Sequence, residues 1–316
     1  MRTTFVMLSV DEAPLLEHSL PAAVAEGFDA GVVIDNASTD ATGELADQFG
    51  VPRLRLPRRV SYNEAVNTAL RQVDADAVAL LTGDTFVSPG YLRACVAALV
   101  DPEVGSVAPK LVRTLGPAQA DRLSLIDAAA MSFDRRRKNN LVGHGTPANL
   151  YSTPTEAFGP DGAAAFWRVS ALQDCAVEGK YFDENMPGWG CDADLAWRAQ
   201  LLGWRTMYEP AAVVHHIRTY SPTTRSAVRP EDRRTQFRNR LLMIAKNDTL
   251  REMAPDLVPL LSYEVLALGY AVLREHELLG GYAEAWRRLP EARRQRRLIQ
   301  SRRRVSRVPL GLEPPR

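Results

Sequence analysis

Two carboxylates in the second half of the chain stand where a catalytic acid or base could act. Asp192 and Asp194 precede an amphipathic run, residues 195–202, that ends before Gly203. Both acids are therefore predicted at the N-terminus of a helix, where free backbone N–H groups and the helix dipole favour Asp for purely structural reasons. The preceding segment places Trp189 between two glycines, a composition typical of binding loops on a rigid scaffold. The sequence pattern fits both a capping role and a catalytic role for these two acids.

Two further acids follow apolar runs that are predicted to be buried strands. Asp35 ends the run 31–35, and Asp84 follows Thr82-Gly83 after a second run. Residues 36–40 are explained as turn and capping residues, but a carboxylate at the end of a buried strand is costly unless it is bonded. Asp35 could accept a hydrogen bond from a nucleobase or a ribose. Asp84 could belong to a simple turn or hold a divalent cation against a diphosphate.

A histidine pair ends another predicted strand. His215 and His216 follow the apolar residues 212–214. Such a histidine is more often a structural residue than a ligand, although a neutral imidazole can bind a metal ion. The chain has no GxGxxG or Walker A motif in its first strands, which disfavours a dinucleotide or P-loop site.

The first hundred residues alternate strand-like and helix-like patterns. The strands are predicted at residues 3–10, 30–34, 53–56, 77–81 and 104–108, and the helices at 14–26, 41–49, 62–73 and 89–100. This order predicts an α/β fold with a parallel, doubly wound sheet. Ligands of such sheets bind beyond the carboxyl ends of the strands, where the acids described above are expected.

Composition sets broad limits on the protein. With 316 residues, 46% of them apolar, and a net charge of +1, the chain can bury one large domain, alone or with an appendage. The three cysteines have no metal-binding or disulfide spacing, so a reducing compartment is the simplest expectation. The apolar run at the N-terminus is too short for a signal peptide. A cytoplasmic protein is expected.

The remaining regions carry weaker signals. Residues 111–160 show little periodic pattern, and their basic cluster 134–140 could be a solvated face or could meet an anionic acceptor. Residues 257–273 are apolar but short of the roughly 20 residues that span a bilayer, so a packed or interfacial helix is expected. The arginine-rich segment 286–307 predicts contact with an anionic membrane surface. A solvated helix or a nucleic-acid tail are its alternatives.

Six short motifs together resemble family 2 inverting glycosyltransferases, most closely the bacterial rhamnosyltransferase-like branch. In this chain they are Asp35–Asp40, Thr82–Asp84, Gly162–Arg168, Tyr181–Glu184, Asp192–Arg198 and Gly203–Arg205. The resemblance covers roughly residues 3–248. It implies a GT-A fold, with a Rossmann-like sheet flanked by helices, a nucleoside-diphosphate sugar donor of the UDP or dTDP type, and Mn²⁺ or Mg²⁺.

The resemblance also implies roles on the donor side. Asp35 matches the acid that pairs with the pyrimidine base, and Ser9 and Asp11 lie where the end of the first strand flanks the nucleotide. Asn63 and Asn67 match a polar helix start near the diphosphate. Asp84 matches the last acid of the Asp-x-Asp metal motif, whose first acid is replaced here by Thr82. His216, six residues after Pro210, is selected over His215 as the metal or diphosphate ligand.

On the acceptor side, Asp192 matches the general base. The resemblance gives Asp194 a positioning or capping role, and Arg198, one turn later, could pair with either acid. Gly162 and Ala163 begin a floor of small residues against which a sugar could lie. Trp189, Asp194 and Arg198 are expected at the substrate. The segments Arg218–Thr223 and Phe237–Arg240 resemble a loop and a helix that could clamp phosphate.

These observations predict a domain over residues 1–248, with a nucleotide-binding half to about residue 110 and an acceptor half after it, and a helical extension over 249–316. The predicted activity is sugar transfer to a hydroxyl of a glycan, a lipid-linked sugar or a small molecule, with no nucleic-acid partner. A nucleotidyltransferase would carry a glycine-rich, basic loop after the first strand, which is missing here. A non-catalytic nucleotide-sugar-binding or membrane scaffold protein is the alternative that Thr82 and Cys191, which replaces a polar residue of the family, leave open.

Overall fold

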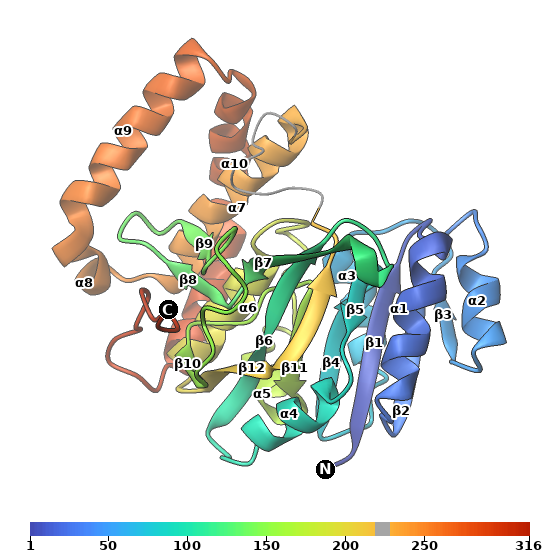
Figure 1. The fold of residues 1–316 in the computed structure, drawn as a ribbon. Coiled ribbons are helices and arrows are strands. Elements are labelled where there is room, and N and C mark those ends of the chain that lie inside the picture. The colour runs from blue at the N-terminus through green and yellow to red at the C-terminus, as the bar shows by residue number, and fades with distance from the viewer. Residues whose placement is uncertain (219–227) are drawn as a thin grey trace.

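The computed structural model describes residues 1–218 and 228–316 (Figure 1). The strands are β1 (Thr3–Ser9), β2 (Ala30–Asp35), β3 (Arg53–Arg55), β4 (Ala77–Thr82), β5 (Thr85–Val87), β6 (Val104–Thr114), β7 (Arg122–Ala128), β8 (Met131–Phe133), β9 (Asn139–Leu141), β10 (Thr155–Ala157), β11 (Ala164–Arg168) and β12 (Arg205–His216). The helices are α1 (Ala13–Ala25), α2 (Thr42–Gln48), α3 (Tyr62–Leu70), α4 (Tyr91–Ala98), α5 (Val169–Cys175), α6 (Cys191–Leu201), α7 (Pro230–Asn247), α8 (Leu250–Met253), α9 (Leu257–Leu273) and α10 (Glu277–Ser301), with short 3₁₀ turns at Gln119–Asp121 and Ala254–Asp256.

Ten strands of the described chain form one sheet with the order β10-β12-β6-β11-β4-β1-β2-β3, to which β5 and β7 pair at the side. The strands β3, β2, β1 and β4 run parallel, as predicted. The parallel pair β6 and β12 is separated from them by β11, which is antiparallel to both its neighbours. The predicted mostly parallel sheet is therefore confirmed, with one reversed strand in its middle.

The sheet has a helical layer on each face because successive residues of a strand point to opposite sides. Phe5 and Met7 of β1 belong to a core with α1, α2 and α4, whereas Val6 and Leu8 belong to a second core with α3, α5 and α6. Both cores are formed by buried side chains. This sandwich fixes the carboxyl ends of β1 and β4 relative to the start of α6.

Two local predictions need correction. Residues 212–214, predicted as a strand of their own, are part of the longer strand β12, whose register with β6 shifts between Glu209 and Val213. The weakly patterned region 111–160 contains short strands of its own, including the antiparallel pair β8 and β9. Strands β8, β9 and β10 are only three residues long, too short to show a periodic pattern, and β10 (Thr155–Ala157) pairs with the distant strand β12.

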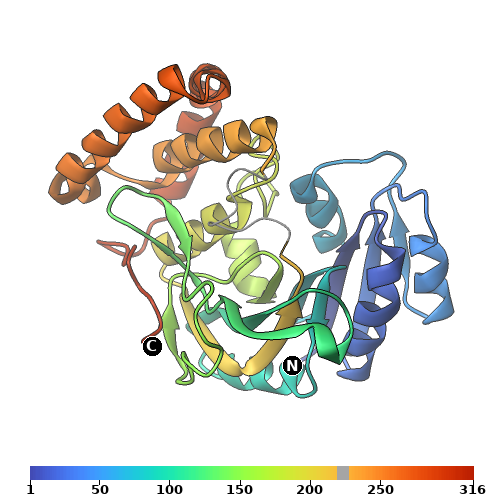
Figure 2. The same cartoon turned by 45° about the horizontal axis from the view of Figure 1, so that its top comes forward.

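The C-terminal helices differ in how they pack. Helix α10 contributes Ala285, Ala292 and Ile299 to a core that also contains Trp197 of α6 and Leu242 of α7. Helix α9 stands away from the sheet in both views (Figures 1 and 2). One helix of the described chain, Leu250–Leu273, is long and apolar enough to cross a membrane. Only 11% of its apolar 18-residue stretch is buried.

The basic cluster 134–140 is divided between solvent and interior: Arg135, Arg136 and Lys138 are exposed, as predicted for a solvated face, whereas Arg137 is not. Arg137 is fully buried and pairs with Asp248 (Nε–Oδ2 2.7 Å) and Asp256 (Nη1–Oδ2 2.6 Å). Arg135 also pairs with Asp256. Arg137 and Arg135 therefore fasten the start of the C-terminal extension to the body, and only for the buried Arg137 is the prediction of a solvated or acceptor-binding residue corrected.

Much of the positive charge of segment 286–307 is paired with acids and backbone carbonyls of the protein itself. Arg303 pairs with Glu252, Arg304 with Asp174, and Arg294 with Glu178 and Glu291. The guanidinium groups of Arg296 and Arg302 donate to backbone carbonyls. These contacts hold α10 and the residues after it against the body, which weakens the prediction that this segment is the membrane contact.

Candidate active site

Asp84 and His216 meet at one edge of the sheet. The pairing of β5 with β12 sets His216 opposite Thr85, and the backbone N–H of Ile217 donates to the carbonyl of Asp84. The His216 Nε2 atom consequently lies 3.6 Å from Asp84 Oδ2. The two residues that the sequence predicted as metal ligands are thus brought together.

Asp127, at the end of β7, lies behind His216. Its Oδ2 accepts a hydrogen bond from His216 Nδ1 at 2.7 Å, and its side chain is fully buried. Burial alone would lower the pKa of His216, but the hydrogen bonds to Asp127 and Asp84 raise that pKa to about 9. Sequence reasoning missed Asp127, although an acid at the end of the apolar run Leu125-Ile126 repeats the signal that identified Asp35 and Asp84.

Arg218 continues this chain of contacts toward a fourth acid. Its Nε donates to Asp127 Oδ1 at 2.7 Å, and its Nη2 donates to Asp161 Oδ2 at 2.8 Å. Burial opposes the charge of Arg218, but Asp161 and Asp127 raise its pKa. Arg218 was predicted to clamp phosphate; in the structure its guanidinium group holds two acids. The rest of that predicted clamp, residues 219–223, lies outside the described residues.

Asp192 is the second residue of α6, as predicted. Its Oδ1 accepts from the N–H of Ala193 at 2.8 Å, and its Oδ2 accepts from the N–H of Gly162 at 3.0 Å. Burial and the charge of Asp161 raise the pKa of Asp192 to about 6. A Cβ atom added to Gly162 would stand 3.0 Å from Asp192 Oδ2, so the small residue is needed for this close approach.

Ala163 joins the two ends of the site. Its N–H donates to Asp161 Oδ1 at 2.9 Å, and its carbonyl accepts from the N–H of Thr82 at 3.1 Å. Thr82 in turn donates its hydroxyl to Asp84 Oδ1. An acid–base series therefore runs from Asp84 through His216, Asp127, Arg218 and Asp161 to the neighbourhood of Asp192.

The predicted base-binding acid, Asp35, is fully buried and already bonded. Its Oδ1 accepts from the N–H of Ser38 at 2.8 Å and its Oδ2 from Arg55 Nη1 at 2.7 Å. Asp11 accepts from the N–H of Thr39 at 2.7 Å and from Arg59. These hydrogen bonds lower the pKa of Asp11 to about 2, and the bond from the Thr39 N–H contributes most. Both acids thus shape the loop after β2, and their partners, Arg55 at the end of β3 and Arg59 after it, are half exposed.

Glu12 is a site residue that the sequence did not single out. Its carboxylate and the Ser9 hydroxyl both lie against Gly83. A Cβ atom added to this glycine would stand 2.6 Å from Glu12 Oε2 and 3.1 Å from Ser9 Oγ. The fully buried Ser9 Oγ has no hydrogen-bond partner of normal geometry. Burial and the charge of nearby Asp84 raise the pKa of Glu12 to about 7. A second carboxyl group therefore lies beside the site where Thr82 replaces an acid.

The raised pKa of Glu12 predicts a pH-dependent stability. An acid with a higher pKa in the folded than in the unfolded state binds more protons when folded, so the free energy of unfolding falls as pH rises from about 4.5 to about 7. Glu12→Gln should remove this loss and stabilise the protein by up to about 3 kcal/mol at pH 8, with little effect at pH 4. The check is urea unfolding at both pH values, with Glu17→Gln, at an exposed residue of the helix that follows Glu12, as control. Equal pH dependence in the Glu12 variant and wild type would refute the assignment.

Asn63 and Asn67, predicted near the diphosphate, are instead fully buried supports of the loop before α6. Asn63 Nδ2 donates to the carbonyls of Asp183 and Met186 at 2.7 and 3.1 Å. Asn67 donates to the carbonyl of Phe182 and accepts from its N–H. We correct their predicted role from ligand contact to loop positioning. A polar helix start has the same sequence pattern in either role.

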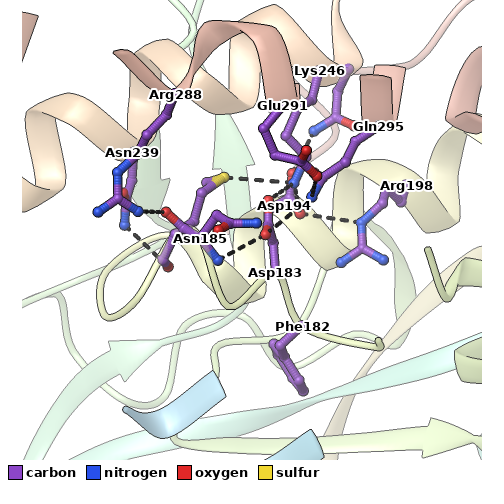
Figure 3. A network of polar contacts seen from close by, with 12 residues as sticks. Phe182, Asp183, Asn185, Asp194, Arg198, Asn239, Lys246, Arg288, Glu291 and Gln295 are labelled. Carbon is purple, nitrogen blue, oxygen red and sulfur yellow. Dashed lines mark hydrogen bonds and ion pairs between the residues drawn. The ribbon is translucent and has the colours of Figure 1, made fainter. Parts of the chain in front are cut away.

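Asp194 and Arg198 also lie in the interior rather than at a ligand surface. Asp194 is fully buried and bonded to Lys246 (2.9 Å), Asn247 (2.8 Å) and Arg198 (3.2 Å), as part of the network in Figure 3. Arg198 also donates to the carbonyls of Cys175 and Tyr181. The predicted pairing of Arg198 with Asp194 is confirmed, but neither side chain is placed to touch substrate. Their role is corrected to joining α6 to α7.

The loop with Trp189 is held from α7. Asn239 Nδ2 donates to the carbonyls of Met186, Pro187 and Trp189 at 3.3, 3.2 and 2.8 Å. Its neighbours Arg238 and Arg240 pair with Glu284 and Glu264, so these arginines are not the predicted phosphate clamp. Trp189 itself is half-buried next to the start of α6, where its substrate contact stays a prediction.

The described residues offer only a small number of protein ligands for a metal ion at this site. In residues 1–218 and 228–316, no group of three or more His, Cys, Asp or Glu side chains is arranged to hold a metal ion. Two ligands that each lie about 2.1 Å from one cation can stand up to about 4.2 Å apart, so Asp84 and His216, at 3.6 Å, fit as a pair. Asp127 orients the imidazole from behind, as carboxylates do for metal-binding histidines. Diphosphate oxygens would have to complete such a site.

Comparison with known proteins gives consistent results. A family model described as "Glycosyl transferase family 2" matches residues 4–170. Two curated relatives, both named "Pre-mycofactocin glycosyltransferase" and both from Mycobacterium tuberculosis, are 31% identical over 192 residues, which is 58% of this chain and 37% of theirs. The chain thus spans little more than a third of the length of these relatives.

Solved structures share the fold at low identity. S. aureus TarS in complex with UDP has a TM-score of 0.57 at 15% identity, over 96% of this chain and 88% of that chain. The mannosyltransferase PcManGT from Pyrobaculum calidifontis, in complex with GDP-Man and Mn²⁺, has a TM-score of 0.54 at 17% identity, over 95% and 85%. GalNAc-T7 with UDP, GalNAc and Mn²⁺ has a TM-score of 0.61 at 12% identity, over 78% and 48%. These likenesses confirm the predicted GT-A fold.

Proposed function

The chain belongs to glycosyl transferase family 2, and from this premise we propose that it is an inverting enzyme with Asp192 as its general base. It moves a sugar from a UDP- or dTDP-type donor to a hydroxyl of a glycan, a lipid-linked sugar or a small molecule. The single observation that carries the proposal is the carboxylate of Asp192, which has a pKa raised to about 6 and is aimed by two backbone N–H groups. A base with a pKa near working pH both exists deprotonated and accepts a proton readily.

Inversion needs one displacement. The acceptor oxygen bonds to the anomeric carbon of the donor while the bond from that carbon to the diphosphate oxygen breaks. The acceptor proton passes to Asp192, and the nucleoside diphosphate leaves as an anion. Gly162 lets the carboxylate of Asp192 approach the backbone closely, and Ala163 connects this point to Asp161 and Thr82.

The donor side rests on the residues at the ends of β1, β2 and β4. We propose that Asp35, with Arg55, presents the loop 36–40 to the base and ribose, and that Ser9, Asp11 and Glu12 flank the nucleotide. Support comes from their convergence at the carboxyl ends of neighbouring parallel strands, where α/β sheets bind ligands. Asp84 and His216 would hold Mn²⁺ or Mg²⁺, which supplies positive charge against the leaving diphosphate.

A donor screen tests this proposal. Melting temperature is measured with UDP-, dTDP- and GDP-sugars, with and without Mn²⁺, and each stabilising donor is then assayed for hydrolysis and for transfer to candidate acceptors. The anomeric configuration of the product, read by NMR, must be opposite to that of the donor. Retention of configuration would refute a single displacement. Stabilisation by a donor without any turnover would favour a nucleotide-sugar-binding protein.

The metal ligands give a separate prediction. Asp84→Ala and His216→Ala should each abolish the additional stabilisation that Mn²⁺ confers on the protein bound to nucleoside diphosphate, because a site with two protein ligands has none to spare. His215→Ala is the matched control. His215 precedes His216 on the same strand, but burial lowers its pKa to about 4, whereas the acids around His216 raise the pKa of that residue. Thermal shift with and without Mn²⁺ is the measurement. An undiminished Mn²⁺ effect in both site variants would place the cation elsewhere.

A further inference from the structure

Helix α9 exposes an apolar surface that nothing in the described chain covers. Nine of its large apolar side chains are exposed, Val258, Val265, Leu266 and Leu273 to between 71% and 77%. Its buried residues are only Leu260 and Ala271. An exposed apolar surface of this extent marks a site of contact with a membrane or another molecule.

The breadth of this surface favours lipid over a single protein partner. At 3.6 residues per turn, the exposed apolar residues from Leu257 to Tyr270 spread over an arc of about 220°. A helix that packs on a protein core needs an apolar stripe of only about 100°. The one charged residue of α9, Glu264, turns to the body and pairs with Arg240. The outer arc therefore carries no charge, as a helix surrounded by hydrocarbon requires.

Both ends of α9 are fastened to the same side of the protein, which excludes a spanning orientation. Just before α9, Asp256 pairs with the buried Arg137. Just after it, Glu275 and Glu277 pair with Arg233 of α7. A spanning helix would carry its two ends to opposite membrane surfaces, whereas these ion pairs hold both ends of α9 to the body of the protein. Figures 1 and 2 show α9 held at both ends, beyond α7 and α10.

The ends of α9 also carry the charge that an anionic bilayer attracts. Arg251 and Arg274 flank the helix and are exposed. Trp286, 75% exposed on α10, is a residue type enriched at the membrane–water boundary. Basic residues beside an apolar helix are attracted by the negative surface of an anionic bilayer.

We propose that α9 is a membrane-docking helix that lies along the surface of an anionic bilayer, buries its outer arc among the acyl chains, and holds the rest of the protein at that surface. The part of the chain that contacts the membrane is then α9, and not the arginine-rich segment 286–307. This membrane docking does not depend on the proposed function, because binding to vesicles is measured without donor or acceptor.

The first experiment measures co-sedimentation of the full chain with vesicles of phosphatidylcholine and with vesicles of equal parts phosphatidylcholine and phosphatidylglycerol. The double variant Val265→Glu/Leu266→Glu should lower the partition coefficient at least about tenfold, because burial of each side chain is lost. Val100→Glu, at an equally exposed apolar residue outside α9 (80%), is the matched control. Unchanged melting temperature in both variants will show that the fold is intact.

The arginines are tested in the same assay. Arg251→Gln/Arg274→Gln should reduce the preference for phosphatidylglycerol vesicles at low salt and leave binding to phosphatidylcholine vesicles nearly unchanged. Failure of the wild-type chain to bind either vesicle would overturn the proposal. So would a wild-type dimer that the Val265→Glu/Leu266→Glu variant turns into a monomer, without vesicle binding, since α9 would then be covered by a second copy.

A second experiment separates lying from spanning. The three native cysteines are buried, so Leu257→Cys, Val265→Cys and Val272→Cys can each be labelled with a fluorophore and quenched by lipids brominated at different depths. A helix in the surface plane should give three similar, shallow depths. A spanning helix would place the label at residue 265 much deeper than the two near the ends, and this result would overturn the proposed orientation.

Discussion

Asp192→Asn should lower the transfer rate by about 10²–10⁴-fold, the usual contribution of a general base, while donor affinity hardly changes. Asn preserves the shape of the side chain but cannot take the acceptor proton. Donor affinity is measured by calorimetry and the rate by single-turnover transfer from the same donor. A near-normal rate in this variant would remove Asp192 from the proposed mechanism.

The hydrogen bonds of Asp192 add a structural effect that must be separated from catalysis. Both carboxylate oxygens accept from backbone N–H groups, of Ala193 and Gly162, whereas an Asn amide has one acceptor oxygen. One unsatisfied donor costs about 1–3 kcal/mol, so a lower melting temperature is expected as well. Stability alone therefore cannot identify the base.

The pH profile supplies the missing distinction. A base with a pKa near 6 should make kcat/KM rise with pH through about 6 and then level off. Asp161→Asn should move this inflection to lower pH, because it removes the negative charge that helps to raise the pKa of Asp192. Burial, the larger cause, remains, so the shift is partial. An inflection that does not move in the Asp161 variant would show that another group is titrating.

Asp194→Ala should destabilise the protein by about 3–5 kcal/mol, because it leaves the buried cations Lys246 and Arg198 without a shared partner. Lys246 Nζ lies 2.9 Å from Asp194 Oδ2 and 2.7 Å from Asp183 Oδ2, and the exposed fractions of the Lys246 and Asp194 side chains are 2% and 0%. Such a loss approaches the whole stability of many domains. Urea unfolding at pH 7 is the measurement.

A surface ion pair serves as the control for Asp194. Glu291→Gln breaks the contact with Arg294, whose side chain is 49% exposed, and should cost at most about 1 kcal/mol. If Asp194→Ala cost no more than this control, the buried network would not be what joins α6 to α7. If it instead lowered turnover with stability intact, Asp194 would have to be considered at the reacting centre again.

Local patterns in the sequence determined the elements that carry the site. The alternation of strand and helix patterns predicted the parallel strands β1 to β4, because side-chain periodicity is set by the backbone of each element alone. Acids after apolar strands located Asp35 and Asp84 at one sheet edge, and glycine before an amphipathic run located Asp192 at the start of α6. These features depend on residues that are neighbours in the chain.

Tertiary structure decided which polar side chains face a ligand and which bind the protein itself. Asn67, Asp194 and Arg137 have the same local patterns as site residues, but their partners Phe182, Lys246 and Asp248 are distant in sequence and became visible only in the fold. The same holds for Asp127 and Asp161, which meet His216 and Arg218 across separate elements. A buried polar group must be paired, and the sequence shows the need for a partner without showing which one. Packing likewise decided that α10 joins the core while α9 remains exposed.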